Sequence, residues 1–468
     1  MIKIDFPPMN FFVQGIEDVT IPKMVRIREK YEDDKIDDIK AHLVGELDGL
    51  DIDRAALKGK SIAITVGSRG IPSLPLMIRT ICDKLKEWGA EPFIIPAMGS
   101  HGGGTVEGNV QILTDYGITE EAMNVPIKAS MDVVQIGTIP DGANTPVFCD
   151  KYAAEADGII LFNKVKPHTD FKGYVESGIC KMIAIGIAKH YGCSWFHRQG
   201  FDTFAERIPL VAKEFLSKMN VVMGIGVVQN AYDEISEIKA FPKDRIIEGD
   251  HELLEIARRR LPKMKFDNID VLVIDRIGKN ISGEGADPNV TGRGSMPGFE
   301  DDFHCKKMFV RGMTEPSHGN ACGLCFADVT TRKCLQGVDW ESTWINFSTN
   351  TMLSAGKIPV YQNSDYEALR LAIRTCTKLT DYSQARIARI RDTLSLSEIE
   401  ISEALLPDVM NRDDVEILSE PYELEFDKDG NLHIPGSPET DVWCCNLFED
   451  GLAGIFSKAY PKALPSRK

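Results

Sequence analysis

The sequence of 468 residues lacks any uninterrupted run of 18 apolar residues, which argues against a membrane-spanning helix. Its N-terminus, MIKIDFPPMNFF, lacks a basic segment followed by a long apolar run, so we expect no secretory signal. Basic residues are fewer than acidic ones, 54 against 70, and the net charge is −16. We therefore expect no general binding to nucleic acid or to anionic membranes, because phosphate groups attract basic surfaces.

Cysteine pairing is also not indicated. The chain has 11 cysteines, an odd number, scattered along a large protein without a signal peptide. This usage is typical of reduced thiols, and it predicts a cytoplasmic protein.

What the sequence does contain is an α/β pattern in a globular composition, with 43% hydrophobic and 26% charged residues. Short apolar runs typical of buried strands alternate with helical patterns, which predicts mainly parallel sheets. The strand-like runs lie at 61–66, 92–96, 157–162, 221–228 and 271–275, and the helical patterns lie at 74–88, 105–116, 251–260 and 366–378.

The length suggests two or three domains. The polar stretch 262–267, PKMKFD, separates a helical pattern from the next strand and is the best candidate boundary. We therefore predict an N-terminal α/β domain over 1–266 and a C-terminal domain over 267–468.

Polar side chains follow three of the predicted strands. Arg69 follows the strand at 61–66, His101 follows the strand at 92–96, and His168 follows the strand at 157–162. Because parallel α/β sheets bind ligands beyond the carboxyl ends of their strands, these three residues are candidates for one site. Arginine matches a carboxylate with two parallel hydrogen bonds, and histidine can take and return a proton near neutral pH.

The glycines after His101 allow two interpretations. Gly102 and Gly103, with Gly104, could form an anion-binding nest of backbone N–H groups before the helix that begins near Thr105. A tight turn that simply needs glycine is an equally good reading.

A lysine lies within an apolar stretch, YVESGICKMIAIGI, which predicts a helix from Tyr174. Lys181 there must reach solvent, pair with an acid such as Glu176, or serve in chemistry, because an unpaired buried charge is costly. The small neighbours Ser177 and Gly178 would let a flat ligand approach. His197 follows Lys181 by 16 residues, about 24 Å along a straight helix, so the two share a site only if the helix breaks, most naturally at Gly192.

These residues resemble the lactate racemase family that uses a nickel-pincer nucleotide. The resemblance covers residues 61–200 best, and the ordered set carries it rather than any single motif. The matching positions are Arg69 after the first strand, His101 in GSHGGG, His168 in KPH, Lys181 in SGICKMIAIGI, and His197 sixteen residues later.

The resemblance implies a role for each position. Lys181 would carry the cofactor, a pyridinium-3-thioamide-5-thiocarboxylic acid mononucleotide, with Ser177, Gly178, Gly102 and Gly103 beside it. His197 would complete the coordination of nickel, which imidazole binds well. His101 and His168 would be the acid/base pair, and Arg69 would hold the substrate carboxylate. The family fold places a cofactor cleft between two α/β domains, and cofactor-synthesis enzymes would be transient partners.

The implied activity is racemisation or 2-epimerisation of a 2-hydroxy acid. Removal of hydride from C2 gives a planar 2-keto acid and avoids a carbanion beside a carboxylate, and return of hydride to the other face inverts the centre.

The sequence also departs from the lactate racemases. Val66 stands where they carry an aspartate, and the loop 279–293 has no counterpart that can be aligned. We therefore predict a substrate larger than lactate, such as a sugar acid or a dicarboxylic hydroxy acid, contacted by Lys279, Asn280, Asn289 and Arg293. A plain glycine- and asparagine-rich connection is an equally open reading of this loop.

Three alternatives stay open. A NAD-dependent dehydrogenase would want GxGxxG after its first strand, which the GSHGGG loop does not provide. A non-catalytic ligand-binding protein on the same scaffold would not need Lys181 and His197 together. Zinc could bind Cys322 and Cys325 with other cysteines and histidines between 304 and 334, although buried free thiols fit better because no second close CxxC pair is present.

Overall fold

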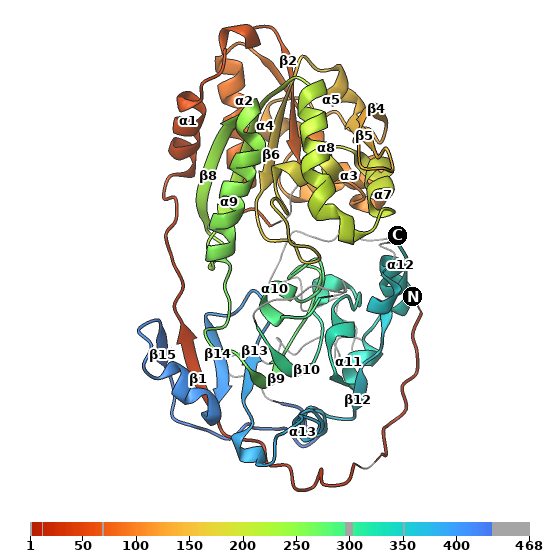
Figure 1. Ribbon diagram of the computed structural model, residues 1–468, viewed down its shortest axis with the longest axis vertical. Helices are drawn as coiled ribbons and strands as arrows, with labels where there is room; N and C mark the ends of the chain where they lie inside the picture. The colour runs from red at the N-terminus through yellow and green to blue at the C-terminus, as the bar shows by residue number, and fades with distance from the viewer. Residues whose placement is uncertain (1, 12, 68–69, 295–302, 350–351, 433–468) are drawn as a thin grey trace. The chain divides into compact units, whose positions relative to one another are not determined.

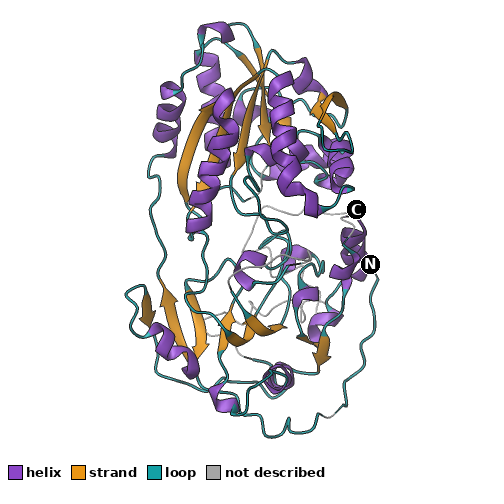
Figure 2. Ribbon diagram, viewed as in Figure 1, coloured by secondary structure: helices purple, strands orange, loops and turns teal. Residues whose placement is uncertain are grey.

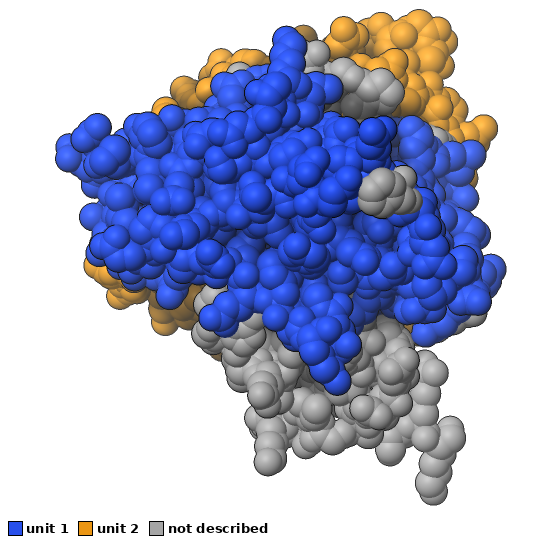
Figure 3. All heavy atoms as spheres, turned by 90° about the horizontal axis from the view of Figure 1, so that it is seen from below, with its two compact units in different colours: residues 1–31, 262–468 blue, residues 32–261 orange. Residues whose placement is uncertain are grey.

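The computed structural model describes residues 2–11, 13–67, 70–294, 303–349 and 352–432. Over these residues the chain forms two compact units, each an α/β structure with a mainly parallel sheet (Figures 1 and 2). Unit 2 comprises residues 32–261, and unit 1 comprises residues 1–31 and 262–468 (Figure 3). The predicted fold class is therefore confirmed. No helix among the described residues has the length and apolar character needed to cross a membrane.

Unit 2 is built on a five-stranded sheet with the order β3-β2-β6-β7-β8. The first four strands are parallel and β8 runs antiparallel to β7. The strands are β2 (Ser61–Val66), β3 (Glu91–Pro96), β6 (Gly158–Lys164), β7 (Val221–Gln229) and β8 (Ile235–Pro242), and β4 (Val133–Thr138) pairs with β5 (Pro146–Asp150) in a separate ribbon.

Nine α-helices are described in unit 2. They are α1 (Ile39–Gly49), α2 (Leu74–Glu87), α3 (Val106–Asp115), α4 (Glu120–Met123), α5 (Lys151–Glu155), α6 (Ile179–Lys181), α7 (Lys189–His197), α8 (Phe204–Lys218) and α9 (Ile246–Arg260). A π-helical turn, η3 (Met182–Gly186), and the 3₁₀ turns at 55–57, 102–104, 201–203 and 243–245 complete the unit.

Hydrophobic runs explain these strands. All six residues of β2 except Ser61 are buried, as expected for a central parallel strand that is covered on both faces. Ile64 of β2, Phe162 of β6 and Ile225 of β7 share one core with Leu43 of α1 and Met77 of α2. The bounds agree with the sequence prediction within a few residues, as the helix α3 illustrates. There Thr105 is the N-cap residue, and its hydroxyl accepts a hydrogen bond from the Gly108 N–H at 3.1 Å.

Unit 1 contains an eight-stranded sheet with the order β12-β11-β10-β9-β13-β14-β1-β15. The five strands from β12 to β13 are parallel, and the remaining three pair antiparallel. The strands are β1 (Met24–Glu29), β9 (Ile269–Ile274), β10 (Cys305–Val310), β11 (Val329–Thr331), β12 (Val360–Gln362), β13 (Ile387–Ile390), β14 (Glu398–Ser402) and β15 (Val415–Ile417); the helices are α10 (Pro288–Thr291), α11 (Arg332–Gln336), α12 (Trp340–Thr349), α13 (Asp365–Arg374) and α14 (Leu406–Val409).

The N-terminal segment lies in unit 1, although the sequence analysis grouped it with residues 32–266. β1 inserts between β14 and β15 through antiparallel pairing, with Ile27 opposite Ile399 on one side and Ile417 on the other. From Val25 to Arg28 the residues of β1 alternate between buried apolar and more exposed charged side chains, which suits a strand with one exposed face. At the other end of unit 2, the division at Pro262 coincides with the predicted polar boundary.

Candidate functional site

The carboxyl ends of three neighbouring strands form one edge of the unit 2 sheet. β2 lies between β3 and β6, and all three run parallel, so the segments that follow them leave the sheet on the same side. His101 follows the end of β3 by five residues, and His168 follows the end of β6 by four. Arg69, which follows β2, lies outside the described residues, and its role as carboxylate ligand stays a prediction.

His168 is buried, and a set of hydrogen bonds fixes it. Its backbone N–H donates to Glu176 Oε2 at 2.6 Å, and its ring packs on Phe171 with 4.4 Å between ring centroids. Nδ1 accepts a hydrogen bond from the backbone N–H of Asp170 at 3.0 Å, and the Asp170 carboxylate lies 3.5 Å from the same nitrogen. Burial, and then the charge of Lys181, hold the pKa of His168 well below its usual range, so the ring is neutral at neutral pH.

Lys181 lies beside His168. Its Nζ is 2.6 Å from Nε2 of the imidazole, and its side chain is half-buried. Glu176, which the sequence offered as a partner for this lysine, instead bonds Arg258 Nη2 at 2.5 Å and the Gly173 N–H at 3.1 Å. Lys181 therefore contacts His168, the acid/base candidate, while Glu176 forms its hydrogen bonds with other groups.

The helix with Lys181 begins later than predicted. Residues 174–178 are not helical, and α6 starts at Ile179, so the expected helix from Tyr174 is wrong. Asp250 on α9 sets this start, because its two carboxylate oxygens accept the N–H groups of Ile179 and Cys180, each at 2.9 Å. A β-carbon on Gly178 would lie 2.0 Å from Asp250 Oδ1. Close approach of Asp250 thus accounts for this glycine, and contact of Gly178 and Ser177 with a cofactor stays a prediction.

The helical path from Lys181 to His197 is interrupted at residues 187–188, before α7, and not at the predicted Gly192. The π-helical turn η3 follows α6, and Lys189, the first residue of α7, adopts a left-handed φ of 54°. Gly192, the predicted break, lies inside α7, where a β-carbon would come within 2.6 Å of the Ala188 side chain. A π-helical turn is common at functional sites, because the extra residue re-aims the side chains around it.

His197 has one ring nitrogen fixed as a donor. Nδ1 lies 2.7 Å from the Cys193 carbonyl oxygen, which can only accept, so this nitrogen carries the proton. The arrangement leaves Nε2 as the nitrogen that can coordinate a metal, and it is the usual backbone support of a ligating histidine. His197 packs edge-on to Phe201 at 5.3 Å, and the His168 ring lies 6.5 Å from the same phenylalanine. Burial lowers the pKa of His197 as well.

The loop with His101 is attached to the same helical segment. The Gly99 N–H donates to the Gly186 carbonyl at 3.2 Å, and Ser100 Oγ lies 3.9 Å from Cys193 Sγ. From the other side, Asn109 of α3 donates to the His101 carbonyl at 2.8 Å. The His101 side chain itself is exposed. The structure therefore holds the His101 loop against the elements that carry Lys181 and His197.

The glycines after His101 form a left-handed turn. Gly102, Gly103 and Gly104 have φ of 64°, 67° and 65°. A β-carbon on Gly102 would meet the Gly108 backbone at 2.5 Å, and one on Gly104 would meet His190 Nδ1 at 2.7 Å. The turn reading thus explains the glycines without a ligand, and an anion-binding role of Gly102 and Gly103 stays a prediction.

The four predicted substrate residues of the loop 279–293 lie in unit 1, where they bond its own polar groups. Thr314 Oγ1 donates to Asn280 Oδ1 at 2.5 Å, and Lys279 donates its backbone N–H to Ser317 Oγ. Buried Asn289 donates to Asp287 at 2.8 Å.

Arg293 is held by several acceptors of unit 1. It bonds Asp328 at 2.6 Å and the carbonyls of Phe326, Cys305 and Lys306. These contacts favour an architectural role for Arg293, and substrate contact by the loop stays a prediction.

Metal-binding clusters are absent from the part of the chain that the structure describes, since no three His, Cys, Asp or Glu residues gather there. Cys305, Cys322, Cys325 and Cys334 are free thiols, and burial raises the pKa of Cys305 and Cys325. The structure thus forms no disulfide at these four cysteines, and the preference for free thiols over zinc stays a prediction.

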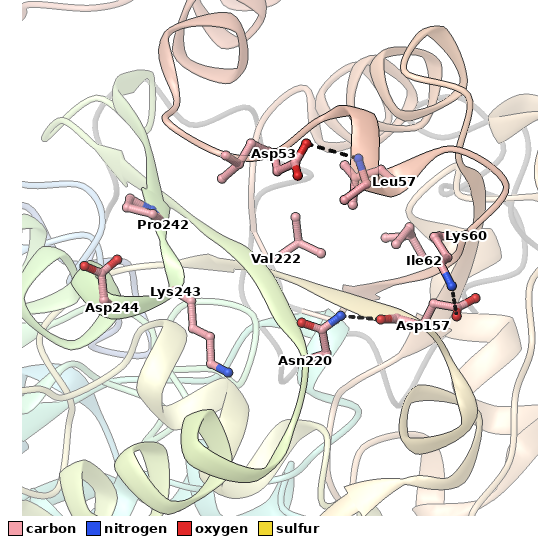
Figure 4. Close-up of a pocket in the computed structure, with 12 residues that line it drawn as sticks. Asp53, Leu57, Lys60, Ile62, Asp157, Asn220, Val222, Pro242, Lys243 and Asp244 are labelled. Atoms are coloured by element: carbon pink, nitrogen blue, oxygen red, sulfur yellow. Dashed lines mark hydrogen bonds and ion pairs between the residues drawn. The ribbon is translucent and has the colours of Figure 1, made fainter.

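A hollow of about 420 Å³ lies at the opposite edge of the unit 2 sheet, where β2, β6 and β7 begin (Figure 4). Its apolar floor includes Leu57 and Val222. At its rim Lys60 pairs with Asp157 at 3.1 Å. Sequence reasoning did not find this hollow, because its residues come from four separate segments of the chain, 52–62, 157, 220–222 and 242–244.

The comparison with protein families matches residues 15–207 to the lactate racemase N-terminal domain. This match confirms the predicted resemblance to the lactate racemase family, and it includes the positions of His101, His168, Lys181 and His197. No curated protein matches the chain. Among solved structures, that of the lactate racemase apoprotein from Thermoanaerobacterium thermosaccharolyticum is similar at 15% identity, with a TM-score of 0.48 over 82% of this chain and 96% of that chain.

Proposed function

We propose that this protein is an isomerase, a racemase or 2-epimerase of a 2-hydroxy acid, which carries a nickel-pincer nucleotide on Lys181. The observation that carries the proposal is the 2.6 Å contact between Lys181 Nζ and His168 Nε2 within the region that resembles lactate racemase. In such an enzyme the lysine that carries the cofactor and the histidine that transfers a proton must lie close together, because the cofactor and the substrate have to be in contact.

The residues present fit this cofactor. The described residues form no cluster of protein ligands for a metal at His197, and in this proposal the organic group would supply its other ligands. The backbone bond of His197 Nδ1 leaves Nε2 for coordination. Lys181 is half-buried and ends α6, where its amine remains within reach of a ligand at the sheet edge.

We assign proton transfer to two histidines and substrate binding to one arginine. His168, neutral through burial, can take a proton from the substrate hydroxyl, while His101 on its exposed loop can supply one at the other face. Arg69 holds the substrate carboxylate. When bound, the nucleotide would supply a hydride acceptor for the hydrogen at C2. Phe171 packs on the His168 ring, which is buried.

The substrate that we propose is larger than lactate, a sugar acid or a dicarboxylic hydroxy acid. The support is the polar loop 279–293 in unit 1, in which Lys279 is half-buried and Asn280 is exposed. Since Asn289 and Arg293 already bond groups of unit 1, the prediction now depends on Lys279 and Asn280.

Co-production with cofactor-synthesis enzymes, the transient partners of this proposal, tests the function. Intact-mass and peptide analysis should place an adduct on the peptide with Lys181, and metal analysis should find nickel. Lys181→Ala should lose the adduct and all inversion. Lys218→Ala, at an exposed position on α8, is the matched control and should keep both. Full activity of Lys181→Ala would refute the proposal, and absence of any adduct would favour a non-catalytic ligand-binding protein.

Substrate class and mechanism require a second experiment. The holoenzyme is incubated with a panel of 2-hydroxy acids that carry a hydrogen label at C2, and inversion is followed by chiral chromatography. A hydride mechanism should return much of the label to C2. Complete loss of the label to solvent would contradict hydride return, and lactate as the best substrate would contradict the proposed substrate size.

A further inference from the structure

Residues 169–178 join His168 to α6, the helix that carries Lys181, and none of them is helical. A segment without a ladder of backbone hydrogen bonds takes its course from the other groups that bond it. The distance between His168 and Lys181 therefore depends on what holds this segment.

The carboxylate of Glu176 closes the first part of the segment into a loop. The side chain is completely buried, and Oε2 accepts the backbone N–H of His168 at 2.6 Å. Oε1 accepts the backbone N–H of Gly173 at 3.1 Å and a hydrogen bond from Arg258 Nη2 at 2.5 Å. The backbone of His168 is thus fixed by a side chain that lies eight positions further along the chain.

Arg258 attaches this loop to α9. The nitrogen that bonds Glu176 also donates to the Gly173 carbonyl at 2.9 Å, while Nη1 pairs with Glu255 of the same helix. The guanidinium supplies the positive charge that the buried carboxylate requires, because a buried charge that loses its partner is strongly destabilising. The Arg258 side chain itself is one-third exposed.

The other end of the segment is attached to the same helix. Asp250 of α9 accepts the backbone N–H groups of Ile179 and Cys180, each at 2.9 Å, and Lys181 is the next residue. One helix therefore holds both ends, and the 2.6 Å contact between Lys181 Nζ and His168 Nε2 depends on these two attachments.

We propose that Glu176 and Arg258 are positioning residues that hold the His168 imidazole at Lys181. Neither side chain contacts the reacting atoms in this role, and both act through the backbone of His168. The inference rests on the proposed function for its catalytic meaning, and it deepens that proposal by assigning a task to a buried ion pair that the mechanism does not use. The geometric part can be measured without any cofactor.

Formaldehyde cross-linking of the full-length apoprotein tests the geometry. Formaldehyde joins an amine to an imidazole through one methylene group, and the hydrogen lost from each nitrogen leaves with the formaldehyde oxygen as water. So short a bridge forms only between nitrogens in close contact, as Lys181 Nζ and His168 Nε2 are. Peptide mass analysis measures the cross-link relative to reductive methylation of Lys181 in a parallel sample, which corrects for access to the amine. Absence of the cross-link in the unaltered protein would overturn the inference.

Variants of the ion pair decide its role. Glu176→Gln should lower the cross-link ratio about fivefold, because an amide has one acceptor oxygen for donors that bond two. Arg258→Gln should lower the ratio similarly, and Arg258→Lys should keep most of it, because an ammonium still neutralises Glu176. Arg260→Gln is the matched control on α9, since Arg260 pairs with Glu237 at 3.2 Å, and it should leave the ratio unchanged.

Unchanged ratios in Glu176→Gln and Arg258→Gln would show that the ion pair serves stability alone, and they would refute the inference. Should Glu176→Gln fail to fold, as circular dichroism would show, Arg258→Gln at its partly exposed position still decides.

The holoenzyme separates this inference from the proposed function. Displacement of His168 should lower kcat for inversion with little change in KM, because His168 transfers a proton and does not bind the carboxylate. The adduct on Lys181 should form as in the unaltered protein. Lower cross-link ratios in a protein that carries no adduct would refute cofactor attachment alone, whereas a normal adduct with unchanged ratios would refute the positioning role alone. A rise in KM without a fall in kcat would also refute that role.

Discussion

Lys189 and Asp150 form an ion pair of 2.8 Å in which both side chains are completely buried. Lys189 starts α7 with a left-handed backbone, and its amine also reaches the carbonyl of Pro96 at the end of β3. Asp150 ends β5, and its Oδ1 caps α5 through the Ala153 N–H. The ion pair therefore connects the end of β5 with the start of the helix that carries His197, and the bond to Pro96 connects the same lysine with the segment before the His101 loop.

Lys189→Met should destabilise unit 2 by roughly 3–5 kcal/mol, because it leaves the Asp150 carboxylate buried without a counter-charge. Urea unfolding followed by circular dichroism measures the loss. In the double variant Lys189→Met/Asp150→Asn the charge is gone and the cap of α5 remains, so much of the stability should return. Equal losses in the single and double variants would show that the ion pair is not the cause.

Gly178→Ala should disturb the start of α6. The added β-carbon would lie 2.0 Å from the Asp250 carboxylate, which must then leave the N–H groups of Ile179 and Cys180. Loss of such a buried cap costs about 1–3 kcal/mol. Gly45→Ala is the matched control, because nothing lies within 4 Å of its β-carbon in α1, and alanine is the better helix former. Thermal unfolding should place Gly178→Ala below the unaltered protein, and Gly45→Ala at or above it.

His197 and His190 should differ in nickel binding. His197 presents Nε2 with Nδ1 bonded to the Cys193 carbonyl, while His190 is exposed on the same helix with Nδ1 against the glycine turn. Metal analysis of holoprotein should find little nickel in His197→Ala and nearly full nickel in His190→Ala. The opposite pattern would refute the assignment.

Local patterns predicted β2, β3, β6 and β7 of the unit 2 sheet but missed β8, and long-range contacts account for other features that they missed. The bounds of the buried strand SIAITV were predicted correctly, because a short apolar run that ends at a glycine is typical of a buried strand. The start of α6 depends on Asp250, 70 residues further along the chain, and Glu176 bonds Arg258, 82 residues away. The hydrophobic pattern around Lys181 gives no information about these distant partners. For the same reason the sequence did not indicate that β1 belongs to unit 1, since β1 pairs with β14, more than 370 residues further along the chain.

The sequence identified four candidate site residues, His101, His168, Lys181 and His197. It did not predict the contacts and distances between them. Each residue type indicated a chemistry, and parallel strands indicated a shared edge. The 2.6 Å contact between Lys181 and His168 depends on the turn at 166–170, the bridge between Lys166 and Ser177 and the late start of α6 together. Such a geometry arises only when several elements are in place.

Glu29 should make unit 1 sensitive to pH. Its side chain is buried in β1, where Oε1 accepts the Lys265 N–H at 2.9 Å and Oε2 accepts the Tyr31 hydroxyl. Burial raises its pKa to about 7, and these hydrogen bonds oppose the rise without cancelling it. Because the folded state holds the proton more tightly than the unfolded chain, with its pKa of 4.5, unfolding releases a proton between these values. The free energy of unfolding should therefore fall as pH rises from about 4.5 to 7.

Glu29→Gln removes the titratable carboxyl group, so this part of the pH dependence of the free energy of unfolding should be lost. Urea unfolding of both proteins at several pH values from 4.5 to 8 measures the effect, and hydrogen exchange of the peptide with Met24–Glu29 locates it in β1. The unaltered protein should lose up to roughly 3 kcal/mol relative to the variant across this window, since one pKa unit corresponds to about 1.4 kcal/mol. Glutamine keeps the carbonyl that accepts the Lys265 N–H, so the variant should fold. Parallel stability profiles would mean that Glu29 keeps its charge when folded, with Lys265 and Arg412 as the cations that stabilise it.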